Sequence, residues 1–207
     1  MKIFFKIDTN DDSIYTVNIN NQKYIINCDN SSIEITETVD KLSFTIQGKI
    51  ERLTLKKCFL TLLLSFIKIP LFALFDYMPE SKWYQNKPIF EFTYKFITKE
   101  IDKDITITIK NSYNQDLKGP QISTNCGIDK IQCDFETCSN SLKKGLVNYI
   151  CDITVAVIIL SVIAGLILLA NTYVSIVLFT IIILSYLILI SSQIAKYRKI
   201  IASLKQK

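Results

Sequence analysis

Two groups of alternating apolar and polar residues flank a long apolar segment in the first half of the chain. The first group occupies five short stretches: residues 2–7, 13–19, 23–28, 33–36 and 42–47. The same period of two returns in residues 88–97 and 104–110. Because successive side chains of a strand point to opposite faces, this pattern predicts strands with one buried face. We therefore expect residues 1–110 to form an antiparallel β-domain, a sandwich or an open barrel, within an α+β chain.

The apolar segment between these groups predicts a helix at about residues 54–75, inserted between the strands. Its polar residues recur every three or four positions and would form a stripe along one side: Thr54, Lys57, Thr61, Ser65 and Lys68. The rest of the helix surface is apolar, so the helix is amphipathic. Lys68 and Pro70 lie beyond the midpoint of the segment and disfavour a full crossing, because a lysine at mid-bilayer costs about 2.5–3.5 kcal/mol.

Three placements of this helix are open. It lies in the membrane interface, or enters it shallowly, with the polar stripe toward the headgroups. Alternatively it packs across the sheet with the stripe toward solvent, or it spans the bilayer. The first placement predicts membrane-interface contacts from five side chains: Lys57, Phe59, Leu63, Phe66 and Lys68.

Two long uncharged segments predict a transmembrane hairpin with helices at about residues 152–170 and 174–192. At about 1.5 Å per residue, each helix matches the roughly 30 Å hydrocarbon core of a bilayer. The short connection makes the two helices antiparallel neighbours. Ser161 and Gly165 are small residues one turn apart, which suits helix packing within the hairpin or between the hairpins of two chains.

Charge is distributed unevenly around this hairpin. Residues 153–192 carry no charge, whereas Lys143 and Lys144 precede the first span. Five basic residues follow the second span: Lys196, Arg198, Lys199, Lys205 and Lys207. The positive-inside rule therefore predicts a multi-pass protein of the cell membrane with both termini in the cytoplasm. The first residues lack the continuous apolar stretch of a secretion signal, which agrees with a cytoplasmic β-domain.

Residues 111–147 show little periodicity and predict an irregular, cysteine-containing linker, followed by the hairpin and its basic tail in residues 148–207. Cys126, Cys133 and Cys138 are weak candidates for a metal site, because zinc takes four ligands and usually includes a close pair of cysteines. The chain has no histidine to complete such a set. In the reducing cytoplasm we expect these cysteines to be free thiols.

The residue pattern points to no catalytic or cofactor-binding residues. Histidine, the commonest general base, is absent, and neither a phosphate-binding loop nor a G-x-S-x-G motif occurs. Basic residues concentrated beside the spans disfavour nucleic-acid binding. We expect a non-enzymatic accessory, scaffold or immunity-type subunit that contacts the lipid bilayer and binds a protein partner, or a second copy through the hairpin. A subunit of an oligomeric pore or transporter and a membrane-surface enzyme acting on lipid are the alternatives.

Overall fold

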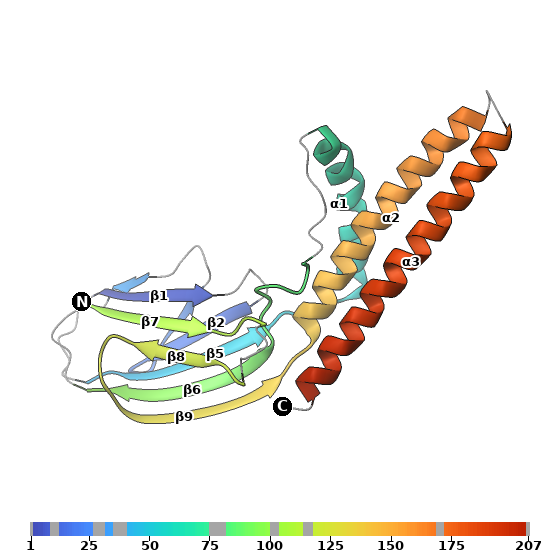
Figure 1. Cartoon of the computed structure of the whole chain (residues 1–207). Coiled ribbons are helices and arrows are strands. Elements are labelled where there is room, and N and C mark those ends of the chain that lie inside the picture. Colours follow the sequence, from blue (N-terminus) through green and yellow to red (C-terminus); the bar gives the residue numbers. More distant parts are fainter. Residues whose placement is uncertain are drawn as a thin grey trace. The chain divides into compact units, whose positions relative to one another are not determined.

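The computed structural model describes residues 2–8, 13–26, 32–34, 41–74, 82–99, 104–113, 118–168 and 172–205. Within these residues the chain is α+β, with two sheets of mostly antiparallel strands and two long apolar C-terminal helices (Figure 1). It divides into two compact units. Met1–Arg52 and Tyr84–Leu142 form the first, here called the β-unit, and Leu53–Trp83 with Lys143–Gln206 form the second, here called the helical unit.

The β-unit contains two sheets. The five-stranded sheet has the order β3-β2-β5-β6-β9, with β2 (Ser13–Ile19), β3 (Gln22–Ile26), β5 (Ser43–Ile50), β6 (Phe90–Thr98) and β9 (Ile128–Thr137). The four-stranded sheet has the order β4-β1-β7-β8, with β1 (Lys2–Asp8), β4 (Ser32–Glu34), β7 (Ile105–Lys110) and β8 (Gln121–Thr124). β1 and β7 pair in parallel, so the expectation of purely antiparallel strands is wrong for this pair. Strands this far apart in sequence are not constrained by a hairpin turn to run in opposite directions.

The inward-facing residues of both sheets form one hydrophobic cluster. The alternating residues of β1 and β7 contribute to it, and Ile3, Ile105 and Ile107 are fully buried. From the five-stranded sheet, the rings of Phe44 and Phe96 stack with their centroids 4.9 Å apart. The alternation in the sequence thus identified the buried face of these strands, because most apolar positions of the period lie in this cluster.

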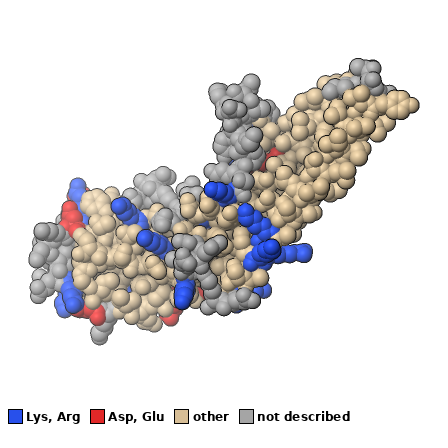
Figure 2. Space-filling view, viewed as in Figure 1, with Lys and Arg blue, Asp and Glu red and all other residues tan. Residues whose placement is uncertain are grey.

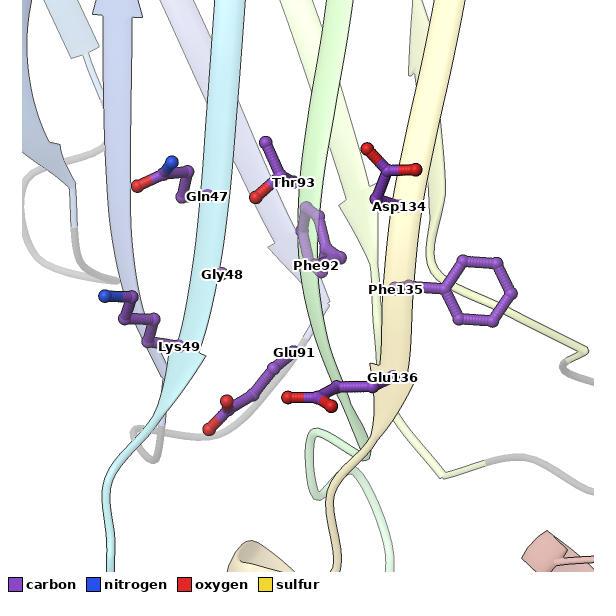
Figure 3. Close-up of a pocket in the computed structure, with 9 residues that line it drawn as sticks. All are labelled: Gln47, Gly48, Lys49, Glu91, Phe92, Thr93, Asp134, Phe135 and Glu136. Carbon is purple, nitrogen blue, oxygen red and sulfur yellow. The ribbon is translucent and has the colours of Figure 1, made fainter.

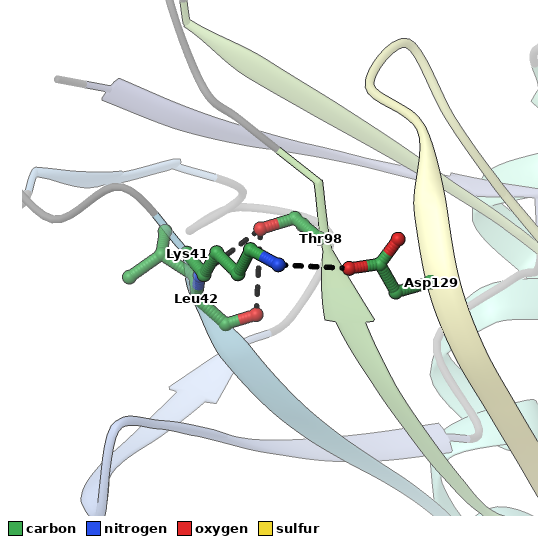
Figure 4. A network of polar contacts seen from close by, with 4 residues as sticks. All are labelled: Lys41, Leu42, Thr98 and Asp129. Atoms are coloured by element: carbon green, nitrogen blue, oxygen red, sulfur yellow. Dashed lines mark hydrogen bonds and ion pairs between the residues drawn. The ribbon is translucent and has the colours of Figure 1, made fainter.

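Local polar contacts fix the ends of the central strands. Asn20 and Asn21 adopt φ values of 46° and 72° in the turn between β2 and β3, a conformation that asparagine tolerates. Before β5, the N–H of Leu42 donates to the hydroxyl of Thr98 at 3.0 Å, and the N–H of Thr98 donates to the carbonyl of Leu42 at 3.0 Å (Figure 4). These bonds hold the start of β5 against the end of β6.

The segment 111–147, expected to be irregular, contains β8, β9 and the start of a helix. β9 pairs with β6 along its whole length, from Phe90 opposite Thr137 to Thr98 opposite Ile128. β9 is an edge strand, and its apolar side chains are only partly covered; Phe135 is 50% exposed. A strand that buries so little needs only a weak apolar pattern, which explains why the sequence did not reveal it.

The helical unit contains α1 (Leu55–Leu74), α2 (Asn140–Leu168) and α3 (Thr172–Lys205). α1 agrees with the helix expected at 54–75. α2 and α3 are longer than the apolar spans, because each continues as a helix into the lysine-bearing residues beside the span. By length and composition, both are able to cross a membrane.

Candidate functional site

α2 and α3 form an antiparallel pair joined by polar contacts along their seam (Figure 1). The hydroxyl of Ser175, which is fully buried, donates to the carbonyl oxygen of Ala164 at 3.0 Å. Toward the basic ends of the two helices, the hydroxyl of Thr154 on α2 lies 3.0 Å from the hydroxyl of Tyr186 on α3. Each hydroxyl therefore has a partner inside the helical unit, as an apolar environment requires.

The two small residues singled out for packing, Ser161 and Gly165, flank the close contact without making it. A Cβ built on Gly165 meets no atom within 4 Å, and Ser161 is half-buried. The tight contact falls instead on Ala164, which is 3% exposed. The pair leaves room beside α2 and remains a prediction for packing between hairpins.

α1 contacts α2 through one short hydrogen bond. The hydroxyl of Ser65 donates to Oδ1 of Asp152 at 2.5 Å, and Ser65 is 1% exposed. The carbonyl oxygen of Thr61 lies 3.0 Å from the same hydroxyl. Asp152 is half-buried, and a partly desolvated carboxylate is stabilised by accepting a hydrogen bond, which Ser65 donates at the start of the uncharged segment.

This contact defines the orientation of α1. The polar stripe was expected to face headgroups or solvent, but its members Thr61 and Ser65 lie on the covered side of the helix. The wide apolar face is exposed instead: Phe59 by 63%, Leu63 by 48% and Phe66 by 43%. Two further residues predicted at the membrane interface border this face, with Lys57 half-buried and Lys68 exposed.

Trp83 packs between α2 and α3 near their basic ends. Its indole N–H donates to the side-chain oxygen of Gln193 at 3.0 Å, and its ring centroid lies 6.3 Å from that of Tyr197. The carbonyl oxygen of Trp83 lies 2.6 Å from where a Cβ would be placed on Gly145. Residue 145 therefore has to be glycine for the backbone of Trp83 to approach α2 this closely.

Most of the apolar surface of α2 and α3 is uncovered in the helical unit. In the most apolar stretch of 18 residues, only 17% is buried in α2 and only 6% in α3. Exposed side chains include Leu160, Leu166 and Ile188, the last by 71%. Fully burying one such side chain is worth about 1.5–3 kcal/mol, so an apolar surface this extensive favours an apolar surrounding.

Basic side chains gather at one end of these two helices, where Figure 2 shows blue residues beside a mainly tan surface. They come from the first turns of α2 and the last turns of α3: Lys143, Lys144, Lys196, Arg198 and Lys199. Because the helices are antiparallel, the basic residues at the start of α2 and those at the end of α3 lie at the same end of the pair.

The β-unit has an open depression of about 420 Å³ on the outer face of β5, β6 and β9 (Figure 3). Glu91 and Glu136 are register partners whose side chains lie near each other there, with Asp134 further along β9 and Lys49 on β5. Glu91 accepts a hydrogen bond from the backbone N–H of Ile50 at 3.2 Å. The surface therefore carries three carboxylates against one lysine, and its openness keeps these groups in contact with water.

The three candidate cysteines lie at separate points of the β-unit as free thiols: Cys126 after β8, Cys133 within β9 and Cys138 after β9. Burial raises the pKa of Cys133 and of Cys138, and the negative charges of Glu91 and Glu136 raise the pKa of Cys138 further. Among the described residues, no group of three histidine, cysteine or acidic side chains could hold a metal ion. Cys28 lies outside the described residues.

Comparisons of the chain with protein-family models, with curated proteins and with solved structures gave no match. Sequence reasoning overlooked Asp152 and Trp83, although each carried a signal. Asp152 immediately precedes an uncharged stretch, and Trp83 is the single tryptophan and lies close to an apolar helix, where interfacial tryptophans occur.

Proposed function

We propose that the chain is a non-enzymatic integral membrane protein that holds a β-sandwich domain at the cytoplasmic surface of the cell membrane. There it acts as an accessory, scaffold or immunity-type subunit. The uncovered apolar surface of α2 and α3 carries this proposal, since only 6% of the most apolar 18-residue stretch of α3 is buried. A lipid bilayer supplies the apolar surrounding that this surface needs.

The charge at the ends of the hairpin supports an orientation with both termini in the cytoplasm. Lys143 and Lys144 lie at the same end as Lys196, Arg198 and Lys199. The connection between the helices, residues 169–171, contains no charged residue. Basic residues are retained on the cytoplasmic side of membranes, so this end belongs there.

Binding suits the β-unit better than catalysis. The carboxylates of Glu91, Asp134 and Glu136 lie in an open depression, and Glu91 is engaged by the backbone of Ile50. General acid–base catalysis calls for a positioned group in a water-excluding site. A sheet with an edge strand such as β9 instead offers backbone groups and side chains to a protein partner.

Alkaline carbonate extraction of membranes that contain the full chain tests the proposal, followed by crosslinking in intact membranes. We expect the protein to stay in the membrane pellet and to crosslink to a distinct protein through lysines of the β-unit, such as Lys95. A variant in which Lys95 is arginine serves as the matched control for the crosslink. Release of the protein by carbonate, or its recovery as an uncrosslinked monomer with a measurable lipid-hydrolysing activity, would contradict the proposal.

A further inference from the structure

We propose that α1 is a re-entrant helix that enters the leaflet on the basic side of the membrane and ends before the far leaflet. Its exposed apolar face then contacts the acyl chains of that one leaflet. This inference rests on the proposed insertion of α2 and α3. It adds a third membrane segment with a defined depth.

Two contacts with α2 place Ser65 and Trp83 along that helix. Ser65, in the middle of α1, lies beside Asp152, and Trp83, which follows α1, lies against Gly145. Gly145 is about 10 Å nearer the start of α2 than Asp152, at about 1.5 Å of rise per residue. The chain therefore passes the level of Asp152 along α1 and has come back below it by Trp83. It leaves on the side from which it entered.

The length of α1 limits its depth. α1 ends at Leu74 and thus extends at most about 14 Å beyond Ser65. α2 continues to Leu168, about 24 Å beyond Asp152. The apolar core begins at the level of Asp152, where the uncharged segment starts. The end of α1 lies at most about 14 Å deeper, which is no further than the middle of a core of about 30 Å. The far leaflet then contains α2 and α3 without α1.

The exposed face of α1 has the chemistry of a lipid-contacting surface. Phe66 and Ile67, 43% and 62% exposed, follow Ser65 and face the acyl chains. Phe59 and Leu63, also exposed, precede Ser65 by about 9 and 3 Å and lie toward the headgroups. Of the polar stripe, Ser65 is turned toward α2 and Thr61 is half-buried. Lys68 is exposed about 4.5 Å beyond Ser65, near enough to the headgroups for its long side chain to reach them. The lysines at the start of α1, Lys56 and Lys57, match the level of headgroups, where basic side chains are favoured.

An unequal number of helices in the two leaflets gives the helical unit a larger cross-section on the basic side. Such a shape fits a membrane that is convex on that side better than a flat one. The function that follows is a preference for curved membrane, which no feature of the hairpin alone would provide.

Depth-dependent fluorescence quenching in reconstituted vesicles tests this inference. The six native cysteines are replaced by serine, and an environment-sensitive fluorophore is attached to cysteine in three single variants. Phe66→Cys probes the exposed face of α1, and Lys95→Cys probes the β-unit. Val162→Cys probes the middle of the uncharged part of α2, where the side chain is 59% exposed. Lipids with a spin label near the headgroup or near the end of the acyl chain serve as quenchers.

We expect the shallow quencher to act best at position 66 and the deep quencher to act best at position 162. Position 95 should respond to aqueous iodide alone. Deep quenching at position 66, equal to that at 162, would show that α1 spans and would overturn the inference. Quenching of position 66 by iodide alone, with position 162 in lipid, would overturn the inference and leave the proposed anchor intact. Quenching of position 162 by iodide alone would remove the anchor as well.

Discussion

The hydroxyl of Ser65 on α1 donates to the carboxylate of Asp152 on α2 across 2.5 Å, and Ser65 is almost fully buried there. This hydrogen bond pairs the acidic residue nearest the uncharged spans with a polar residue of the inserted helix. An ionisable group at the edge of the hydrocarbon core is expensive unless it has such a partner. The pair therefore orients α1 so that its polar side is covered and its apolar side is free.

We expect Ser65→Ala to destabilise the helical unit by about 1–3 kcal/mol, because it leaves the Asp152 carboxylate without its hydroxyl donor. Asp152→Asn keeps an acceptor oxygen and should cost less. Thermal unfolding of the detergent-solubilised protein measures both. Thr180→Ala is the matched control, since Thr180 is an exposed residue of α3 whose hydroxyl bonds within its own helix. If Ser65→Ala and Thr180→Ala unfold at the same temperature, the contact between α1 and α2 contributes nothing.

Two glycines of α2 should respond differently to the addition of one methyl group. Gly145→Ala places a Cβ 2.6 Å from the backbone oxygen of Trp83, so it should displace Trp83 and cost about 1–3 kcal/mol. Gly165→Ala meets no atom within 4 Å and should be neutral or slightly stabilising. Tryptophan fluorescence reports the change directly, because the chain has one tryptophan. An emission spectrum of Gly145→Ala identical to that of the wild-type protein would count against the packing of Trp83 on α2.

Cys138 should react with iodoacetamide more slowly at pH 8 than a free thiol does, because the thiolate is the reacting form and burial raises the pKa of this thiol. Since the pKa is raised, the rate should keep increasing as the pH rises above the ordinary range of a cysteine. Glu91→Gln removes one of the negative charges that raise the pKa of Cys138 and should move the midpoint of the rate profile to lower pH. Glu34→Gln, on the exposed strand β4, should leave the midpoint unchanged. The same midpoint in both variants would mean that Glu91 does not act on Cys138.

The proposed shape of the helical unit predicts sorting by curvature. In lipid tubes pulled from giant vesicles, protein with its basic end outside should be enriched several-fold on the tube relative to the vesicle. Replacing Leu63 and Phe66 by serine should abolish the enrichment while the protein stays inserted. Ile25→Ser, at an exposed apolar position of β3, is the matched control. Equal enrichment of all three proteins would show that α1 does not cause curvature preference.

The strands with strong alternation and the three apolar segments could be predicted from the sequence. Ile3, Ile105 and Phe44 lie in the core because each occupies the apolar position of a period of two. α1 was predicted within one residue at each end, since its polar residues recur at helical spacing in a mainly apolar segment and a polar residue precedes it. These features are local, so a single pattern in neighbouring residues is sufficient to reveal them.

The features that the sequence did not reveal depend on long-range pairing. β9 is stabilised by its register with β6, and its own residues carry only a weak pattern. The orientation of α1 depends on Asp152, which follows Ser65 by 87 residues. Periodicity indicated that α1 has a polar stripe but could not indicate whether water, headgroups or another helix satisfies it. The role of Trp83 likewise depends on Gly145 of α2 and Gln193 of α3, which are distant from it in sequence.

Site-directed labelling of intact cells with a membrane-impermeant maleimide tests the central claim, that α2 and α3 form a membrane hairpin with its basic end in the cytoplasm. In the variant without native cysteines, Thr172→Cys probes the first residue of α3, next to the connection between the helices, and Ser203→Cys probes the end of α3. We predict that the label added outside reacts with position 172 and reaches position 203 only after the membrane is permeabilised. Labelling of position 203 in intact cells, with position 172 protected, would contradict the orientation. Labelling of neither position, before or after permeabilisation, would contradict the predicted exposure of the two ends of the hairpin.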